Sequence, residues 1–194
     1  MVHIELMISS SMKMALLIST RYIVFFLSLV LTSSLSHSKE AEVGEPMIRQ
    51  QCRISSTPTT CLSCLRSDPE AMKADAAGIV AIVVNCMASR LTVLSRNMTE
   101  LVQKSADPKF RPALISCSLV YDDAAKLLQR VVPPSLMRGD FVGANRLVGL
   151  ATESQVACVA GFHDKFLFPA NVADDMKVFD ELSDSAINML DRLS

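Results

Sequence analysis

Residues 52–69 read CRISSTPTTCLSCLRSDP, and this stretch decides the fold that we expect for the rest of the chain. Cys52 and Cys61 flank a turn rich in serine and threonine, in which the run around Pro58 cannot continue a helix. The chain therefore turns back, and the two cysteines can face each other. A disulfide between them would close a loop of about ten residues and contribute roughly 2.5–3 kcal/mol. We expect a stapled helical hairpin over about residues 47–66.

The end of this stretch predicts the start of a long helix. Ser67-Asp68-Pro69-Glu70 supplies a capping side chain, a proline at the first helical position and an acid in the first turn. Apolar residues then recur at spacings of three and four up to about residue 105, which marks one face of a helix. These residues are Met72, Ala76, Ile79, Val83, Met87, Leu91, Leu94, Met98 and Leu101.

The same spacing predicts three more helices. The second opens at Ala106-Asp107-Pro108 and ends at Val132-Pro133-Pro134, the third covers about residues 140–162, and the fourth follows Pro169. The seam of the second is Phe110, Leu114, Cys117, Tyr121, Ala124, Leu128 and Val131. The seam of the third, interrupted at Gln155, is Ala144, Val148, Ala151, Cys158 and Phe162. The seam of the fourth is Val172, Met176, Phe179, Ser183, Ala186, Leu190 and Leu193. Four such helices with short loops predict an all-α, up-down-up-down bundle over about residues 69–194.

Composition agrees with a helical bundle and argues against several functions. Half of the 194 residues are hydrophobic, tryptophan is absent and only six residues are glycine. The net charge of −1, without a basic stripe, argues against a nucleic-acid partner. His163 is the one histidine clearly outside the N-terminal leader, and no GxSxG or HExxH motif is present. We therefore expect no enzyme activity, no catalytic residue, no metal site and no cofactor.

The N-terminus predicts a secretory signal peptide over residues 1–37. The apolar run YIVFFLSLVL at 22–31 is preceded by Lys13 and Arg21 and followed by small residues, with cleavage expected near Ser36 or Ser38. A membrane anchor is the alternative, but the run is too short to span a bilayer, which takes about 20 residues. We expect a secreted domain over 38–194, free of the membrane after cleavage, in a compartment where cysteines form disulfides.

The remaining cysteines and one sequon leave alternatives open. Cys117 and Cys158 lie on inward seams of consecutive helices, and pairing them would close a loop of about 40 residues and contribute roughly 4 kcal/mol. CLSC at 61–64 has no second CxxC, which argues against a redox or metal site. Cys64 and Cys86 are then either free thiols or a third disulfide, because six cysteines allow 15 pairings. Asn97-Met98-Thr99 is a possible N-glycosylation site.

Four segments in this order resemble the plant invertase and pectin methylesterase inhibitors. They are CRISSTPTTCLSCLRSDPEA, LISCSLVYDDAAKLLQR, GDFVGANRLVGLATESQVACVAGF and ELSDSAINMLDRL. The match spans about residues 50–194. The resemblance implies the pairings Cys52–Cys61 and Cys117–Cys158. It also implies a proteinaceous inhibitor that forms a non-covalent complex with its target enzyme in the apoplast or cell wall, or in the vacuole for an invertase target.

The resemblance leaves three alternatives for the target. The first is pectin methylesterase, the second is acid invertase, and the third is a diverged member with a structural or binding role. The Pro-Lys-Phe motif of invertase inhibitors follows a Gly-Asp between the two bundle cysteines, whereas Pro108-Lys109-Phe110 here precedes Cys117. The corresponding place reads Arg138-Gly139-Asp140-Phe141, and these four residues are the predicted target contacts. Because the proline and lysine of the motif are missing there, the sequence favours an invertase target less. The third helix reads NRLVGLATES where pectin methylesterase inhibitors often carry a tryptophan.

Overall fold

The structure, a computed structural model, describes residues 44–104, 107–162 and 166–194. Within these ranges every regular element is a helix. The predicted signal peptide over 1–37 and the histidine at position 163 lie outside the described residues.

The N-terminal hairpin consists of α2 (Glu45–Cys52) and α3 (Pro58–Ser67). Pro58 stands at the first position of α3, where a backbone N–H would have no helical partner in any case. A disulfide joins Cys52 to Cys61 across the turn, with their Cα atoms 5.5 Å apart, and both side chains are buried. The turn and the disulfide together set the direction of α3 relative to α2.

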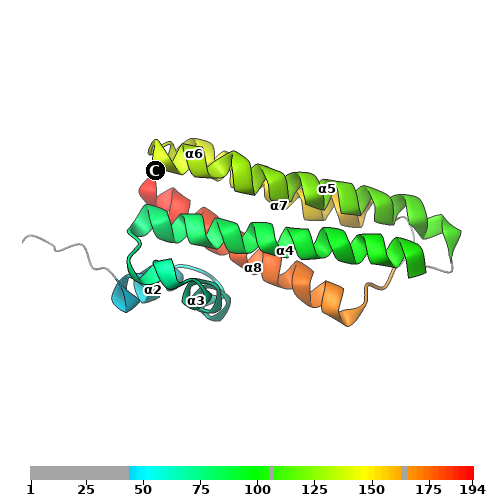
Figure 1. The fold of residues 1–194 in the computed structure, drawn as a ribbon, viewed down its shortest axis with the longest axis horizontal. Helices are drawn as coiled ribbons and strands as arrows, with labels where there is room; N and C mark the ends of the chain where they lie inside the picture. The colour runs from blue at the N-terminus through cyan, green and yellow to red at the C-terminus, as the bar shows by residue number, and fades with distance from the viewer. Residues whose placement is uncertain (1–43, 105–106, 163–165) are drawn as a thin grey trace, which may run out of the picture. The chain divides into compact units, whose positions relative to one another are not determined.

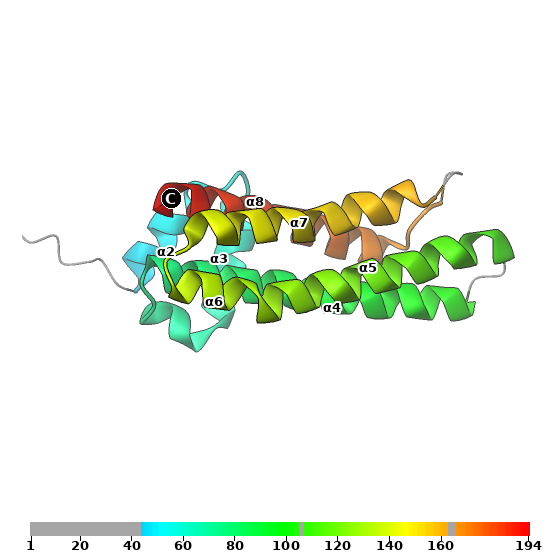
Figure 2. The same cartoon turned by 90° about the horizontal axis from the view of Figure 1, so that it is seen from above.

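Four long helices form the bundle: α4 (Ala76–Lys104), α5 (Arg111–Arg130), α7 (Phe141–Ala160) and α8 (Ala170–Leu193). Each runs opposite to the preceding one along the chain (Figures 1 and 2). α4 and α7 each pack against both α5 and α8, so the four helices enclose one core. This is the predicted up-down-up-down bundle.

Two of the bundle helices begin later than the sequence predicts. Pro69–Met72 forms a separate 3-10 helix, η1, capped by the carboxylate of Asp68. A second carboxylate, that of Asp75, then accepts a backbone N–H within the first turn of α4. The chain bends between these two caps, so a continuous helix from position 69 was a wrong prediction, and the side chain of Met72 is 51% exposed instead of lying in the core. η2 (Pro108–Phe110) precedes α5 in the same way.

The sequence analysis did not predict α6 (Val132–Met137), a short helix between α5 and α7. The prolines at 133 and 134 do end α5, because a proline inside a helix loses a hydrogen bond and clashes with the preceding turn. In the first turn of a new helix neither penalty applies, so the same two prolines also start α6. The two prolines therefore mark both the end of α5 and the start of α6.

Most of the predicted seam residues lie in the core, where the large buried side chains include Tyr121, Leu128 and Phe179. Besides Met72, Val131 differs from the prediction. Val131 is 44% exposed because α5 ends beside it. The interruption at Gln155 is bridged by Ser154, which is buried in its place and donates its hydroxyl to the carbonyl of Ala151 at 2.7 Å.

α4 is long and apolar enough to cross a membrane by length and composition alone. Within the bundle, however, ten of its side chains are buried, so its apolar character serves the core. Core helices of globular proteins pass the same test for this reason.

The hairpin packs on α4 through both of its helices and on α8 through α3. The backbone N–H and the hydroxyl of Ser56 both donate to Oδ2 of Asp184, at 3.0 and 2.8 Å. Partial burial raises the pKa of Asp184, but these hydrogen bonds outweigh it and hold the pKa below its ordinary value. The hydroxyl of Ser185 donates to that of Ser55 at 2.7 Å, and both of these serines are buried. The hairpin is therefore docked by polar contacts as well as by apolar packing.

Four phenylalanines close the end of the bundle at which α4 finishes and α5 begins. Their ring centroids lie between 4.8 and 6.2 Å apart in five pairs. Phe110 comes from η2, and Phe162, Phe166 and Phe168 come from the connection between α7 and α8. The cluster joins two loops that are distant in the sequence.

Candidate docking surface for a protein partner

The outer side of α7 is unusually apolar for a helix on the surface. Its 20 residues, FVGANRLVGLATESQVACVA, include only two charged side chains. The inner seam is buried as predicted, but apolar side chains also point outward, each between 47% and 70% exposed. These outward residues are Val142, Leu150, Val156 and Val159. A helix that is hydrophobic on both sides is usually covered on both sides, so the outer face of α7 is suited to a partner.

α5 also carries exposed apolar residues. Ile115 and Leu119 lie one helical turn apart and are 49% and 60% exposed. Each is two residues from Cys117, which is bonded to Cys158 of α7 with the Cα atoms 4.5 Å apart. Val156, also two residues from its cysteine, therefore lies at the same level of the bundle. We call these six exposed residues the α5–α7 surface: Ile115, Leu119, Val142, Leu150, Val156 and Val159.

Two open grooves run along the flanks of α7. The groove towards α5 has a volume of about 430 Å³ and is bordered by Val120 and Leu127 of α5 and Leu150 of α7. The groove towards α8 has a similar volume, about 430 Å³, and its walls include Val156 of α7 and Asp180 of α8. Grooves beside a protruding apolar helix can accept side chains of a docked protein.

One carboxylate stands in the groove between α7 and α8. Asp180 accepts a hydrogen bond of 2.5 Å from Nε2 of Gln155. Partial desolvation by the groove raises the pKa of Asp180, and the bond from Gln155 only partly opposes this effect. Beneath it, the hydroxyl of Tyr121 is buried, and within the described residues neither this hydroxyl nor Oε1 of Gln155 has a hydrogen-bond partner. Desolvation, followed by the nearby charge of Asp180, raises the pKa of Tyr121 well above its ordinary value.

The predicted target contacts at 138–141 form the junction between α6 and α7. Gly139 has a φ of 72°, in the left-handed region that glycine adopts most readily. Asp140 is the N-cap of α7, and its Oδ1 accepts the N–H of Gly143 at 2.9 Å. Phe141 is partly buried against the core, whereas Arg138 is exposed. Three of the four residues therefore have structural tasks, and the junction lies at the far end of α7 from Val156 and Val159.

The two cysteines whose state the sequence left open are bonded to each other. The Cα atoms of Cys64 on α3 and Cys86 on α4 are 6.2 Å apart, and their Sγ atoms form a disulfide. The structure has no free cysteine among its described residues. Nor does this part of the chain contain a group of three or more histidine, cysteine or acidic side chains that could hold a metal ion.

Asn97, the predicted glycosylation site, lies on α4, and its side chain contacts α8. Its Nδ2 atom, to which a glycan would be attached, donates to Oδ2 of Asp175 at 3.2 Å. The other oxygen of this carboxylate binds Nη1 of Arg90 at 2.6 Å. Asp175 thus joins two residues of α4 to α8, and a glycan on Asn97 would replace one of these contacts.

Known proteins share the sequence pattern and the architecture of this chain. A family model described as plant invertase/pectin methylesterase inhibitor matches residues 46–190. A pectinesterase inhibitor of Actinidia deliciosa is 24% identical over 154 residues, which cover 79% of this chain and 80% of that protein.

Solved structures share the fold. The crystal structure of mutant form A of a pectin methylesterase inhibitor from Arabidopsis has a TM-score of 0.61 and 20% identity, covering 74% of this chain and 94% of that one. That of a pectin methylesterase inhibitor from Arabidopsis thaliana has a TM-score of 0.56 and 19% identity, covering 77% and 97%. These likenesses confirm the predicted fold class, a four-helix bundle with an N-terminal extension.

Proposed function

This chain belongs to the plant invertase/pectin methylesterase inhibitor family, whose members are non-enzymatic inhibitors, and from that premise we propose that it blocks a pectin methylesterase. The observation that carries the proposal is the α5–α7 surface, with its two flanking grooves. The inhibitor docks this surface beside the cleft of the target and keeps the polymeric substrate out. It performs no chemistry itself, and the complex is non-covalent.

The bundle is suited to this task because it is rigid where the surface lies. The disulfide between Cys117 and Cys158 ties α5 to α7 at the level of Ile115, Leu119 and Val156. A preorganised surface loses little conformational entropy on binding, so more of the contact energy is retained as affinity. α7 alone is about 30 Å long at 1.5 Å per residue.

Acid invertase is the second candidate target, because the family description covers inhibitors of both enzymes. Two observations favour pectin methylesterase instead. The relative from Actinidia deliciosa is named a pectinesterase inhibitor. The junction at 138–141 also lacks the proline and lysine of the invertase-type motif.

We further propose that residues 1–37 direct the chain into the secretory pathway and that residues 38–194 form the mature inhibitor. Three disulfides in one domain are typical of proteins that fold in an oxidising compartment. The mature protein then acts in the apoplast or cell wall, or in the vacuole for an invertase target. The sequon at Asn97 makes it a candidate glycoprotein.

Titration of the oxidised, purified protein against a plant pectin methylesterase and an acid invertase, at several pH values, tests the proposal. We expect loss of the methylesterase activity to be complete near one equivalent, with a complex of both proteins visible by size-exclusion chromatography. Inhibition of invertase alone would select the second target. Inhibition of neither enzyme would contradict the proposal and leave a structural or binding role.

A further inference from the structure

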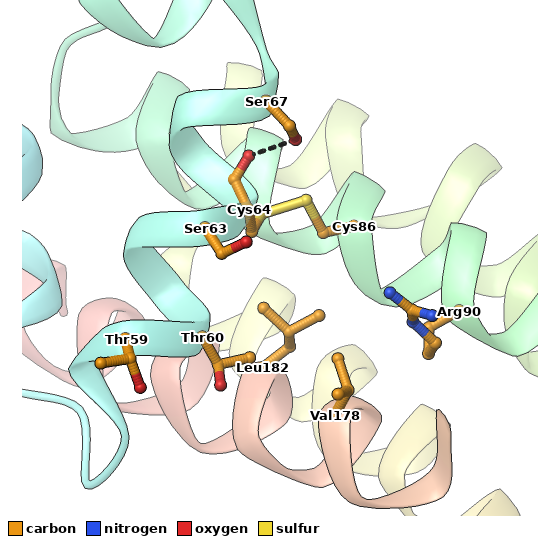
Figure 3. A pocket seen from close by; sticks show the side chains of 9 residues that line it. All are labelled: Thr59, Thr60, Ser63, Cys64, Ser67, Cys86, Arg90, Val178 and Leu182. Carbon is orange, nitrogen blue, oxygen red and sulfur yellow. Dashed lines mark hydrogen bonds between the residues drawn. A yellow bond between two sulfur atoms is a disulfide. The ribbon is translucent and has the colours of Figure 1, made fainter. Parts of the chain in front are cut away.

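A groove of about 470 Å³ lies where α3 of the hairpin meets α4 and α8 of the bundle (Figure 3). The disulfide between Cys64 and Cys86 lies in it, and hydroxyl side chains of α3, among them Thr60 and Ser63, form one wall. Leu182 of α8 stands on the other side. A small thiol or the tip of a protein loop can therefore approach this disulfide from solvent.

The other two disulfides are not accessible in this way. Both cysteines of the hairpin staple and both cysteines of the bundle tie are at most 2% exposed. Cys64 is 8% exposed, and Cys86 is only partly buried. Thiol–disulfide exchange requires a thiolate to reach one sulfur, so access decides which bond reacts first. In this protein the difference in access singles out one bond of three.

The same bond has a distinct place in the fold. Cys52–Cys61 lies within the hairpin and Cys117–Cys158 within the bundle, whereas Cys64–Cys86 joins the hairpin to the bundle. If this disulfide is broken, the described contacts that still hold the hairpin on the bundle are the chain connection to α4, apolar packing, and polar contacts such as that of Ser56 with Asp184.

We propose that Cys64–Cys86 is a thiol–disulfide exchange site, at which a dithiol reductant releases the hairpin from α4. A thiolate of the reductant attacks Sγ of Cys86, the more exposed residue of the pair, and the S–S bond breaks. Cys64 leaves as a thiolate and takes up a proton. The second thiol of the reductant then attacks the mixed disulfide, so the reductant ends as a disulfide and Cys86 as a thiol. Two electrons and two protons pass to the protein.

The structure provides for the released thiol of Cys64. Its Sγ atom lies 3.9 Å from the carbonyl oxygen of Ile82, within reach of a weak S–H hydrogen bond. The chemical class of partner is a dithiol, and a protein carrying a CxxC motif on an exposed turn meets this requirement.

Partial reduction followed by alkylation tests the exchange step. The oxidised protein is treated with limiting dithiothreitol, trapped with iodoacetamide and mapped by mass spectrometry of its peptides. We expect Cys64 and Cys86 to be labelled about tenfold faster than the four buried cysteines. Equal rates, or earlier labelling of either buried pair, would overturn the proposal.

A matched pair of variants tests whether the groove provides the access. Ser63→Phe places a ring in the groove and should slow the labelling of Cys86 several-fold. Ser116→Phe, at an exposed position of α5 outside the groove, should leave the rate unchanged. Equal rates in both variants would show that the reductant does not enter through the groove, and would contradict the proposed route.

The release step has its own measurement. The double variant Cys64→Ser/Cys86→Ser keeps the other two disulfides and mimics the reduced state. We expect trypsin to cut it after Arg53, in the hairpin turn, about tenfold faster than the oxidised wild type, because local opening governs cleavage. The bundle should remain uncut in both proteins. Unchanged cleavage in the double variant and in the selectively reduced wild type would show that the bond does not hold the hairpin.

Discussion

The side chain of Gln155 on α7 donates from Nε2 to Oδ2 of Asp180 on α8, over 2.5 Å. This hydrogen bond crosses one of the two grooves that flank the α5–α7 surface. Gln155 interrupts the apolar seam of α7, and its position is explained by this contact. The bond places a carboxylate whose pKa is raised in the wall of a groove that also contains Val156 and Val159.

Asp180→Asn should reduce the dependence of stability on pH. The raised pKa means that the folded protein binds the proton of Asp180 more tightly than the unfolded chain does. Stability is therefore lost as the pH rises from the ordinary aspartate pKa through the raised one, and stays lower above it. The asparagine variant lacks this loss and can still accept the hydrogen bond from Gln155.

Urea unfolding of both proteins between pH 3 and pH 7 measures this effect. The variant should gain in unfolding free energy relative to the wild type as the pH rises. Asp174→Asn, at an exposed position on the same helix, should show no such gain. A gain that shrinks with rising pH would contradict the assignment.

Tyr121→Phe should be neutral or stabilising, in contrast to most changes in a core. The hydroxyl is buried, and no described residue pairs with it. Removing such a group relieves a desolvation cost of about 1 kcal/mol or more. Tyr121→Ala, which also removes the ring, should cost about 3–5 kcal/mol. Thermal unfolding separates the two, and a loss above about 1 kcal/mol for Tyr121→Phe would reveal a bound water as its partner.

The periodic core was predictable from the sequence because burial repeats with the helix. The fourth seam, from Val172 to Leu190, is buried throughout, and it alternates spacings of four and three without a break. Helix starts were less predictable, since two carboxylates, Asp68 and Asp75, compete to cap one helix and the sequence does not rank them. The choice depends on where the hairpin docks.

The candidate site was harder to predict than the core. Exposed apolar residues such as Val156 do not repeat with the helical period, so the sequence pattern does not distinguish them from other residues on the outer side of α7. The scarcity of charge along residues 141–160 was the available signal. The pairing of Cys64 with Cys86 depends on how the hairpin lies against α4, and no local pattern encodes that contact.

Asp140→Ala should lower stability more than it changes inhibition. The carboxylate caps α7, and loss of an N-cap side chain costs about 1 kcal/mol. Arg138→Ala removes an exposed side chain from the same junction and should leave stability within about 0.5 kcal/mol of the wild type. Chemical denaturation and inhibition titrations of both variants separate a structural role from target contact. A strong loss of inhibition in Arg138→Ala would assign the contact to this junction.

Val156→Lys should weaken inhibition of the target about tenfold or more, corresponding to a loss of about 1.4 kcal/mol in binding. The side chain is 70% exposed and lies at the level of the disulfide between α5 and α7. A lysine there places a charge within the proposed interface, where it would be desolvated without a partner. The unfolding free energy should stay within about 0.5 kcal/mol of the wild type, because the free protein leaves this position in water.

Two further lysine variants locate the effect. Met72→Lys changes a residue of η1, beside the hairpin, whose side chain is 51% exposed. Met137→Lys changes the last residue of α6, next to the junction at 138–141, whose side chain is 88% exposed. Both remove an exposed methionine without disturbing the core, so both should inhibit as the wild type does if the target docks around Val156, at the far end of α7 from Met137. Loss of inhibition confined to Met137→Lys would move the interface to the junction. Equal loss in all three variants would indicate a general effect of added positive charge, since a local contact cannot depend equally on three separate places.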